Sequence, residues 1–234
     1  MSATLSLKAW VKRGEHPAAR LAFRVAKAVR SARVPVIRPL HQALYALHKG
    51  VTGAWSNATR ILWWTPMFLS RVENEAPGLY LEGGMPLVLG PLSIRLGRDV
   101  RLSATTTLTG RSASAAPLLE VGSNVDIGWQ TTIAVGTRVV MGDNVRLAGR
   151  CFLAGYPGHP LEAERRAAGL PCDAAQIGDI ILEDDVWLAS GVTVLAGVRI
   201  GRGTVVGTGS VVTRDLPPDV IAAGCPARVI REIG

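Results

Sequence analysis

The chain has 234 residues, of which 48% are hydrophobic and only 5% aromatic, so its core must depend on Val, Ile, Leu and Ala. Charged residues make up 19% and the mean hydropathy is +0.25, values that argue against a disordered chain. Three cysteines are too few for a disulfide framework and favour a reducing compartment. No apolar stretch reaches the roughly 20 residues of a transmembrane helix, and no signal peptide is visible. We therefore expect a cytoplasmic protein.

Nearly all of the positive charge lies in residues 1–50. Ten Lys or Arg residues stand there against one acidic residue, which gives +9, so the other 184 residues sum to −1. Apolar and basic residues separate onto different helical faces over residues 17–30, and a second apolar pattern runs from Leu40 to Val51, broken near Gly50 and Gly53. The segment between them contains two prolines and is expected to be extended. We expect residues 1–80 to form a basic helical arm or cap.

This arm has two competing interpretations. In the first, the arm is a helical cap whose apolar face packs on the main domain. In the second, it is a basic amphipathic helix that lies on the anionic inner face of the cell membrane, with Trp63 and Trp64 at the interface. A nucleic-acid partner is not expected, because aromatic residues are not interleaved with the basic ones.

The second half of the chain carries a six-residue repeat. Helices with a period of 3.6 and strands with a period of 2 do not produce this spacing, whereas stacked coils of short strands and tight turns do. The repeated inward positions are Val121, Ile127, Ile133, Val139 and Val145, with Cys151 next, and then Leu182, Leu188, Val194, Ile200, Val206 and Val212. A weaker run comprises Leu96, Leu102 and Leu108. The repeat predicts a mainly β solenoid over residues 81–217, and a solenoid without activity is the alternative that a functional site has to exclude.

One long polar loop, residues 152–176, interrupts the repeat. Long loops inserted into regular scaffolds are often functional. This loop contains His159, the only histidine after residue 48. Histidine ordinarily titrates near pH 6.5 and therefore suits general-base work near neutrality. Cys151, at an inward repeat position, is expected to be a small core residue.

The segment that begins at Ile177 and includes "GSVVTRDLPPDVIAAGCPARVI" resembles the C-terminal half of hexapeptide-repeat acyltransferases. The closest branch resembles the maltose/galactoside O-acetyltransferases and the acetyltransferases of polysaccharide biosynthesis. The resemblance implies a left-handed parallel β-helix, a C-terminal tail segment at residues 218–234, and a homotrimer that binds acyl-coenzyme A between subunits.

The resemblance also implies roles for individual residues. His159, in "GHPLEAERR", is the expected general base, and Glu162 is a candidate to orient its ring. Trp187 and Gln130 are candidates for the acceptor site. The expected coenzyme contacts are Ala189, Ser190, Gly207, Thr208, Thr213 and Arg214.

These observations predict an O-acetyltransferase that uses acetyl-CoA as co-substrate, needs no metal, and acts on a hydroxyl of a saccharide or polysaccharide precursor. The alternatives are N-acetylation of an amino sugar or antibiotic and, in another class, a non-catalytic scaffold. A zinc-dependent carbonic anhydrase is disfavoured, because such a site needs about three histidines and His159 is the only one in the repeat.

Overall fold

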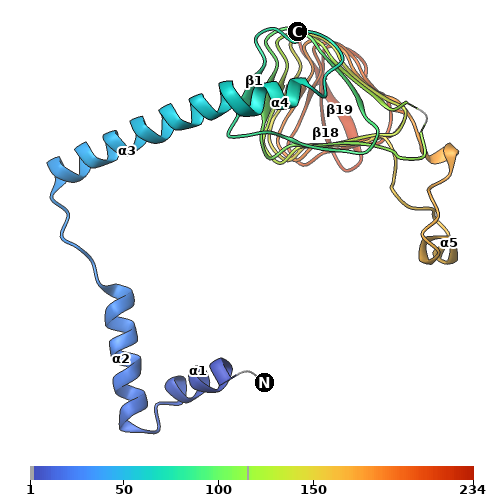
Figure 1. The fold of residues 1–234 in the computed structure, drawn as a ribbon. Helices are drawn as coiled ribbons and strands as arrows, with labels where there is room; N and C mark the ends of the chain where they lie inside the picture. Colours follow the sequence, from blue (N-terminus) through green and yellow to red (C-terminus); the bar gives the residue numbers. More distant parts are fainter. Residues whose placement is uncertain (1–2, 115) are drawn as a thin grey trace. The chain divides into compact units, whose positions relative to one another are not determined.

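The computed structural model describes residues 3–114 and 116–234 (Figure 1). The chain divides into two compact units, one ending at Val51 and the other spanning Thr52–Gly234.

The first unit is helical and almost coreless. It comprises α1 (Ala3–Arg13), α2 (Pro17–Ser31) and the start of α3 (Arg38–Thr59). His16 caps α2, because its Nδ1 accepts the N–H of Ala18 at 3.1 Å. Only Ala19 is buried in α2, and no residue is buried in α3. The two predicted helices are present, but α3 continues through Gly50 and Gly53, since a helical glycine lowers helix propensity without breaking the helix.

The second unit starts with helical segments that contact the β-structure. A π-helix, η1 (Arg60–Trp64), leads into α4 (Thr65–Leu69). Phe68 is buried in the core, and Trp64, Leu69 and Val72 pack against it. Residues 60–72 therefore cap the solenoid.

Three parallel sheets form a left-handed β-helix, as predicted, with coils that lie one behind another in Figure 1. The first sheet holds β1 (Tyr80–Glu82), β4 (Arg101–Ser103), β7 (Asp126–Ile127), β10 (Arg146–Leu147), β13 (Trp187–Leu188), β16 (Val205–Val206), β18 (Val220–Gly224) and the antiparallel β19 (Ala227–Glu232). The second holds β2 (Leu87–Leu89), β5 (Thr107–Gly110), β8 (Thr132–Val135), β11 (Phe152–Ala154), β14 (Thr193–Leu195) and β17 (Val211–Val212). The third holds β3 (Ser93–Leu96), β6 (Leu118–Val121), β9 (Arg138–Met141), β12 (Ile180–Leu182) and β15 (Arg199–Ile200).

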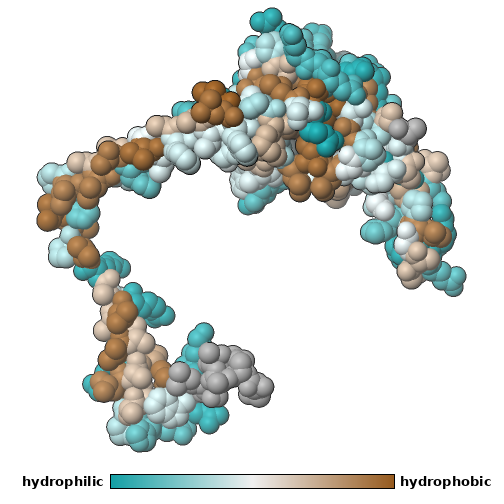
Figure 2. All heavy atoms as spheres, in the orientation of Figure 1, coloured by the Kyte–Doolittle hydropathy of each residue, from teal (hydrophilic) through white to brown (hydrophobic). Residues whose placement is uncertain are grey.

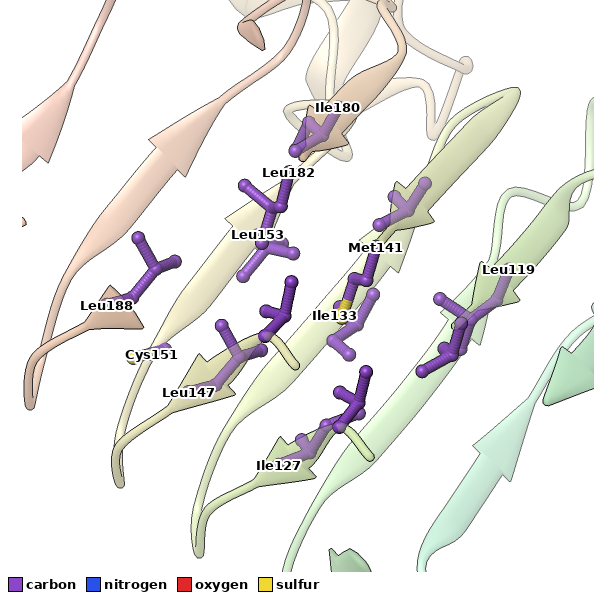
Figure 3. Packing of buried hydrophobic residues seen from close by; sticks show 14 of the residues in the cluster. Leu119, Ile127, Ile133, Met141, Leu147, Cys151, Leu153, Ile180, Leu182 and Leu188 are labelled. Atoms are coloured by element: carbon purple, nitrogen blue, oxygen red, sulfur yellow. The ribbon is translucent and has the colours of Figure 1, made fainter. Parts of the chain in front are cut away.

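Aliphatic residues of successive coils stack along the axis and form the core (Figure 3). Leu188 pairs in register with Leu147 on one side and Val206 on the other. Every inward position that the repeat predicted is buried, Cys151 included. Each coil buries its apolar residues only against the neighbouring coils, so no coil is stable by itself and the stacking of coils stabilises the β-helix.

The predicted register is wrong between Ile133 and Cys151. Val121 pairs with Met141, not with Val139, and Ile133 pairs with Leu153. Ile133 and Met141 are eight residues apart, two more than the six-residue period allows. The inward residues that continue the stack of Val121, Ile127 and Ile133 are therefore Met141, Leu147 and Leu153. Val139, Val145 and Cys151 stay buried because they fall on other inward positions of the same coils.

Two longer insertions interrupt the regular coil. Paired residues of successive coils are 18 apart where the repeat is regular, as for Trp187 and Val205. They are 41 apart across the long loop, as for Arg146 and Trp187, and 25 apart for Arg101 and Asp126. The second insertion, between β5 and β6, was not predicted. Both insertions leave the helix between the second and third sheets.

The tail extends the first sheet. β18 pairs with β16 in parallel, and β19 folds back on β18. Thr204 is buried where the tail begins, and its Oγ1 donates to the carbonyl of Pro217 at 2.6 Å and accepts the N–H of Val220 at 3.3 Å.

Candidate active site

The long loop is organised by its own charged residues. It leaves β11 and returns at β12, and it contains α5 (Ala163–Ala167) and the short 3-10 helix η2 (Ala174–Gln176) (Figure 1). The Arg165 guanidinium holds both carboxylate oxygens of Asp173, at 2.9 Å and 2.8 Å. This hydrogen-bonded partner lowers the pKa of Asp173 and raises the pKa of Arg165. A bidentate pair of this kind fixes α5 relative to the part of the loop that leads to η2.

His159 is exposed and lines a cleft of about 310 Å³. Tyr156 and Pro171, from the same loop, are also in its lining. Glu162, the candidate to orient the ring, pairs instead with Arg165, to which its carboxylate lies at 3.2 Å. Arg165 is three residues further along and therefore competes for that carboxylate.

Arg111 is a cleft residue that the sequence analysis missed. It follows β5, at the start of the insertion between β5 and β6. Its Nη2 donates to the carbonyl of Cys172 at 3.0 Å, and its Nη1 lies 3.5 Å from Ser114 Oγ. The side chain therefore joins the two insertions. One signal in the sequence could have revealed this insertion. The paired residues Arg101 and Asp126 are 25 residues apart instead of 18, so the coil between them carries extra residues.

Five predicted site residues lie in turns between the first and second sheets. They are Gln130, Ala189, Ser190, Gly207 and Thr208. Successive coils stack there, since the N–H of Gly209 donates to the carbonyl of Ser190 at 3.0 Å. Trp187 comes just before this corner, on the outer face of β13, and half of its surface is exposed. We call this edge the first–second corner.

Gln130 takes part in a small polar cluster at that corner. Its Oε1 accepts a hydrogen bond from Arg150 Nε at 3.2 Å, and the Arg150 guanidinium lies over the ring of Trp129 at 4.7 Å. Gly149 has no room for a side chain, because a Cβ there would lie 2.5 Å from the indole nitrogen of Trp129. The indole of Trp129 thus lies against the backbone at Gly149, with the Arg150 guanidinium over its ring.

The other predicted residues lie at the corner between the second and third sheets. Thr213 and Arg214 follow β17 there, and the His159 loop leaves the same corner two coils earlier. A hollow of about 480 Å³ opens between the loop and the next coil, and its lining includes Tyr156, Gln176 and Leu195. Within one chain, therefore, the second sheet separates His159 from Trp187, Gln130 and Ser190.

The second sheet differs from the third in charge. None of its six strands contains a charged residue, and its outward positions are apolar or Thr, as at Thr132, Phe152 and Thr193. The third sheet, by contrast, presents ion pairs such as Arg138 with Glu120 at 2.8 Å.

Cys151 is confirmed as a core residue. Its Sγ donates to the carbonyl of Ala148 at 3.2 Å, and burial raises the pKa of the thiol. A buried thiol with a raised pKa is a poor nucleophile. Among the described residues, no group of three or more His, Cys, Asp or Glu side chains could hold a metal ion. Nor does the described part of the chain contain a helix long and apolar enough to cross a membrane.

Comparison with known proteins agrees with the repeat. The bacterial transferase hexapeptide (six repeats) family matches residues 179–214. Galactoside O-acetyltransferase of Escherichia coli K12 is 42% identical over 118 residues, which are 48% of this chain and 56% of that protein. Putative acetyltransferase YJL218W of Saccharomyces cerevisiae is 40% identical over 120 residues, 49% of this chain and 59% of that protein. The matched part thus spans little more than half the length of these relatives.

Solved structures show the same fold at lower identity. AntD, an N-acyltransferase from Bacillus cereus determined with dTDP and 3-hydroxybutyryl-CoA, superposes with a TM-score of 0.57 at 17% identity. The match covers 72% of this chain and 87% of that one. The chain thus carries a hexapeptide repeat and is similar to acetyltransferases over about half of its length, as its repeat and its tail predicted.

Proposed function

We propose that this protein is an O-acetyltransferase that moves the acetyl group of acetyl-CoA to a hydroxyl of a saccharide or polysaccharide precursor. One observation carries the proposal. The only histidine of the β-helix lines a cleft on an inserted loop, in a chain 42% identical to a galactoside O-acetyltransferase over the matched part.

His159 acts as the general base in this proposal. Its ring nitrogen removes the proton of the acceptor hydroxyl while the oxygen attacks the thioester carbonyl. Backbone N–H groups of the loop or coil stabilise the tetrahedral oxyanion. The C–S bond then breaks, and protonated His159 returns its proton to the departing thiolate. No covalent enzyme intermediate is needed, in keeping with the buried thiol of Cys151.

Binding of acetyl-CoA requires a second subunit in this proposal. The expected coenzyme contacts Ser190 and Thr208 lie at the first–second corner, whereas Thr213, Arg214 and the His159 loop lie at the other end of the second sheet. A cyclic homotrimer with parallel axes brings one corner of each subunit to the opposite corner of its neighbour. The uncharged second sheet between the corners supports this arrangement, since charged residues are depleted in interface cores.

Two other functions remain alternatives. N-acylation of an amino sugar or antibiotic is favoured by the fold shared with AntD, which is an N-acyltransferase. A non-catalytic scaffold would neither bind acetyl-CoA nor release thiol from it. Calorimetric titration with acetyl-CoA separates the scaffold from both enzymes.

Replacement of His159 tests the mechanism. His159→Ala should lower the turnover rate by roughly 10²–10⁴, the usual contribution of a general base. The melting temperature should stay nearly constant, because the side chain is exposed. Thiol release from acetyl-CoA with a panel of saccharide acceptors is the assay. Cys225→Ala, which removes an exposed thiol outside the mechanism, is the control and should retain full activity. Full activity of His159→Ala would refute the assignment.

We also propose that residues 1–50 contact the anionic inner face of the cell membrane. No acidic residue occurs between Glu15 and Glu73, and apolar side chains such as Val29 and Leu47 are exposed along α2 and α3 (Figure 2). Each basic residue near such a surface contributes on the order of 1 kcal/mol. The protein should sediment with vesicles that contain phosphatidylglycerol at low salt, and should stay in solution with phosphatidylcholine alone. Equal behaviour with both vesicles would exclude this contact.

A further inference from the structure

The cleft beside His159 contains a second basic side chain that acetyl transfer by His159 does not use. Arg111 lines the cleft together with Ser112, Tyr156 and His159. Its bond to the carbonyl of Cys172 holds the guanidinium at the junction of the two insertions. The side chain is partly exposed, so it can reach a ligand in the cleft.

Arg111 has no carboxylate partner among the described residues. Arg138 on the third sheet, by contrast, pairs with an acidic neighbour. Of the three acidic residues of the long loop, Glu162 and Asp173 are engaged by Arg165, and Glu164 is not in the cleft lining. No acidic residue contributes to the cleft lining. Among the described residues, therefore, no carboxylate lines the cleft or pairs with Arg111.

We propose that Arg111 binds an anionic group of the acceptor, so that the acceptor is an acidic saccharide carrying a carboxylate or a phosphate. This inference rests on the proposed function. The planar guanidinium is suited to bidentate contact with such groups, and two of its five N–H donors are used within the described chain. The reacting hydroxyl must lie at His159 in the same cleft, so both groups belong to one small molecule.

The same charge bears on the choice of acceptor class. The ammonium group of an amino sugar in this cleft would be repelled by Arg111, whereas a uronic acid or sugar phosphate would be attracted. The cleft thus favours O-acetylation of an acidic sugar over N-acetylation of a cationic one.

Protection of His159 from diethyl pyrocarbonate tests the proposal without using activity. Full-length protein is modified in the presence of glucuronate or glucose, and carbethoxylation of His159 is followed by peptide mass spectrometry. From the concentration dependence of protection, glucuronate should bind at least about tenfold more tightly than glucose, as expected for one charge-assisted contact. Arg111→Gln should abolish the difference, and Arg111→Lys should keep part of it.

A second variant guards against loss of loop structure in Arg111→Gln. Ser112→Asp leaves the Arg111–Cys172 hydrogen bond in place and adds a carboxylate to the cleft, so it should also abolish the preference for glucuronate. Equal protection by glucuronate and glucose in the unmodified protein, or an unchanged preference in both variants, would overturn the proposal.

The phosphates of coenzyme A are the other source of an anion. CoA and 3′-dephospho-CoA are therefore tested in the same assay. If CoA protects His159 through Arg111 while dephospho-CoA and glucuronate do not, Arg111 binds the coenzyme phosphate and the inference about the acceptor is wrong. Failure of the acetyl-transfer proposal is separate, since it would appear as no thiol release from acetyl-CoA with any acceptor.

Discussion

Two neighbouring valines of β9 should respond in opposite ways to the same substitution. Val139 is 0% exposed and points into the core, whereas Val140 is partly exposed on the outer face of the third sheet. In Val139→Asp, lost burial of the valine costs about 2 kcal/mol. An unpartnered neutral carboxyl adds roughly 1–3 kcal/mol. The buried carboxyl must also be protonated at pH 7, which is about three units above the ordinary pKa of Asp. This protonation costs up to about 4 kcal/mol more.

The total of about 7–9 kcal/mol is comparable with the whole stability of an ordinary domain. Val139→Asp should therefore unfold the β-helix at pH 7, while Val140→Asp should change the free energy of unfolding by less than about 1 kcal/mol. Burial raises the pKa of the introduced carboxyl in the folded state. The loss of stability is consequently smallest below pH 4 and grows as the pH rises from there to 7.

Urea unfolding followed by circular dichroism at pH 4 and pH 7 measures both effects. A Val139→Asp variant that unfolds at the same urea concentration as the unmodified protein would show that this face of β9 is not inward. A Val140→Asp variant as unstable as Val139→Asp would show that burial on β9 does not alternate.

Two further substitutions probe the loop and the tail. Asp173→Asn should leave the melting temperature almost unchanged but increase proteolysis within residues 152–176. Arg165 lowers the pKa of Asp173, so the carboxylate stays charged at neutral pH. The unmodified loop should therefore become equally sensitive to proteolysis only as the pH falls below about 4. Thr204→Val should destabilise the protein by about 1–3 kcal/mol in thermal unfolding, since it leaves the N–H of Val220 and the carbonyl of Pro217 without their buried partner, and Thr204→Ser should restore most of the loss.

The fold could be predicted because a β-helix repeats one simple requirement. Each coil must present a small set of aliphatic residues inward, so Leu188 and Val206 recur at fixed separations and leave a period in the sequence. The register error at Val139 has a physical cause. Two extra residues between Ile133 and Met141 preserve burial by moving other aliphatic residues inward, so the pattern looks unbroken where the pairing has shifted.

The site was less predictable than the fold. His159 stands out as a candidate in the sequence because it is the only histidine of the repeat and lies in its longest interruption. Arg111 is 48 residues away in sequence and reaches the same cleft only because both insertions leave the same corner of the β-helix. The partner of Glu162 could not be predicted from the sequence either, because Arg165 and His159 are both three residues from Glu162 along the chain.

The division of the predicted site between two corners leads to a final prediction. Ser190 and His159 lie at opposite ends of the second sheet, so each site of the proposed homotrimer takes one corner from each of two subunits. His159→Ala and Ser190→Trp should each inactivate the homotrimer. In a mixed cyclic trimer, however, one of the three interfaces always joins an intact His159 to an intact Ser190. Random mixing should therefore restore about one quarter of the unmodified activity, measured as thiol release after co-refolding equal amounts of the two variants. If the mixture stays as inactive as its components while forming trimers by light scattering, each site is contained in one chain and the shared-site arrangement is wrong.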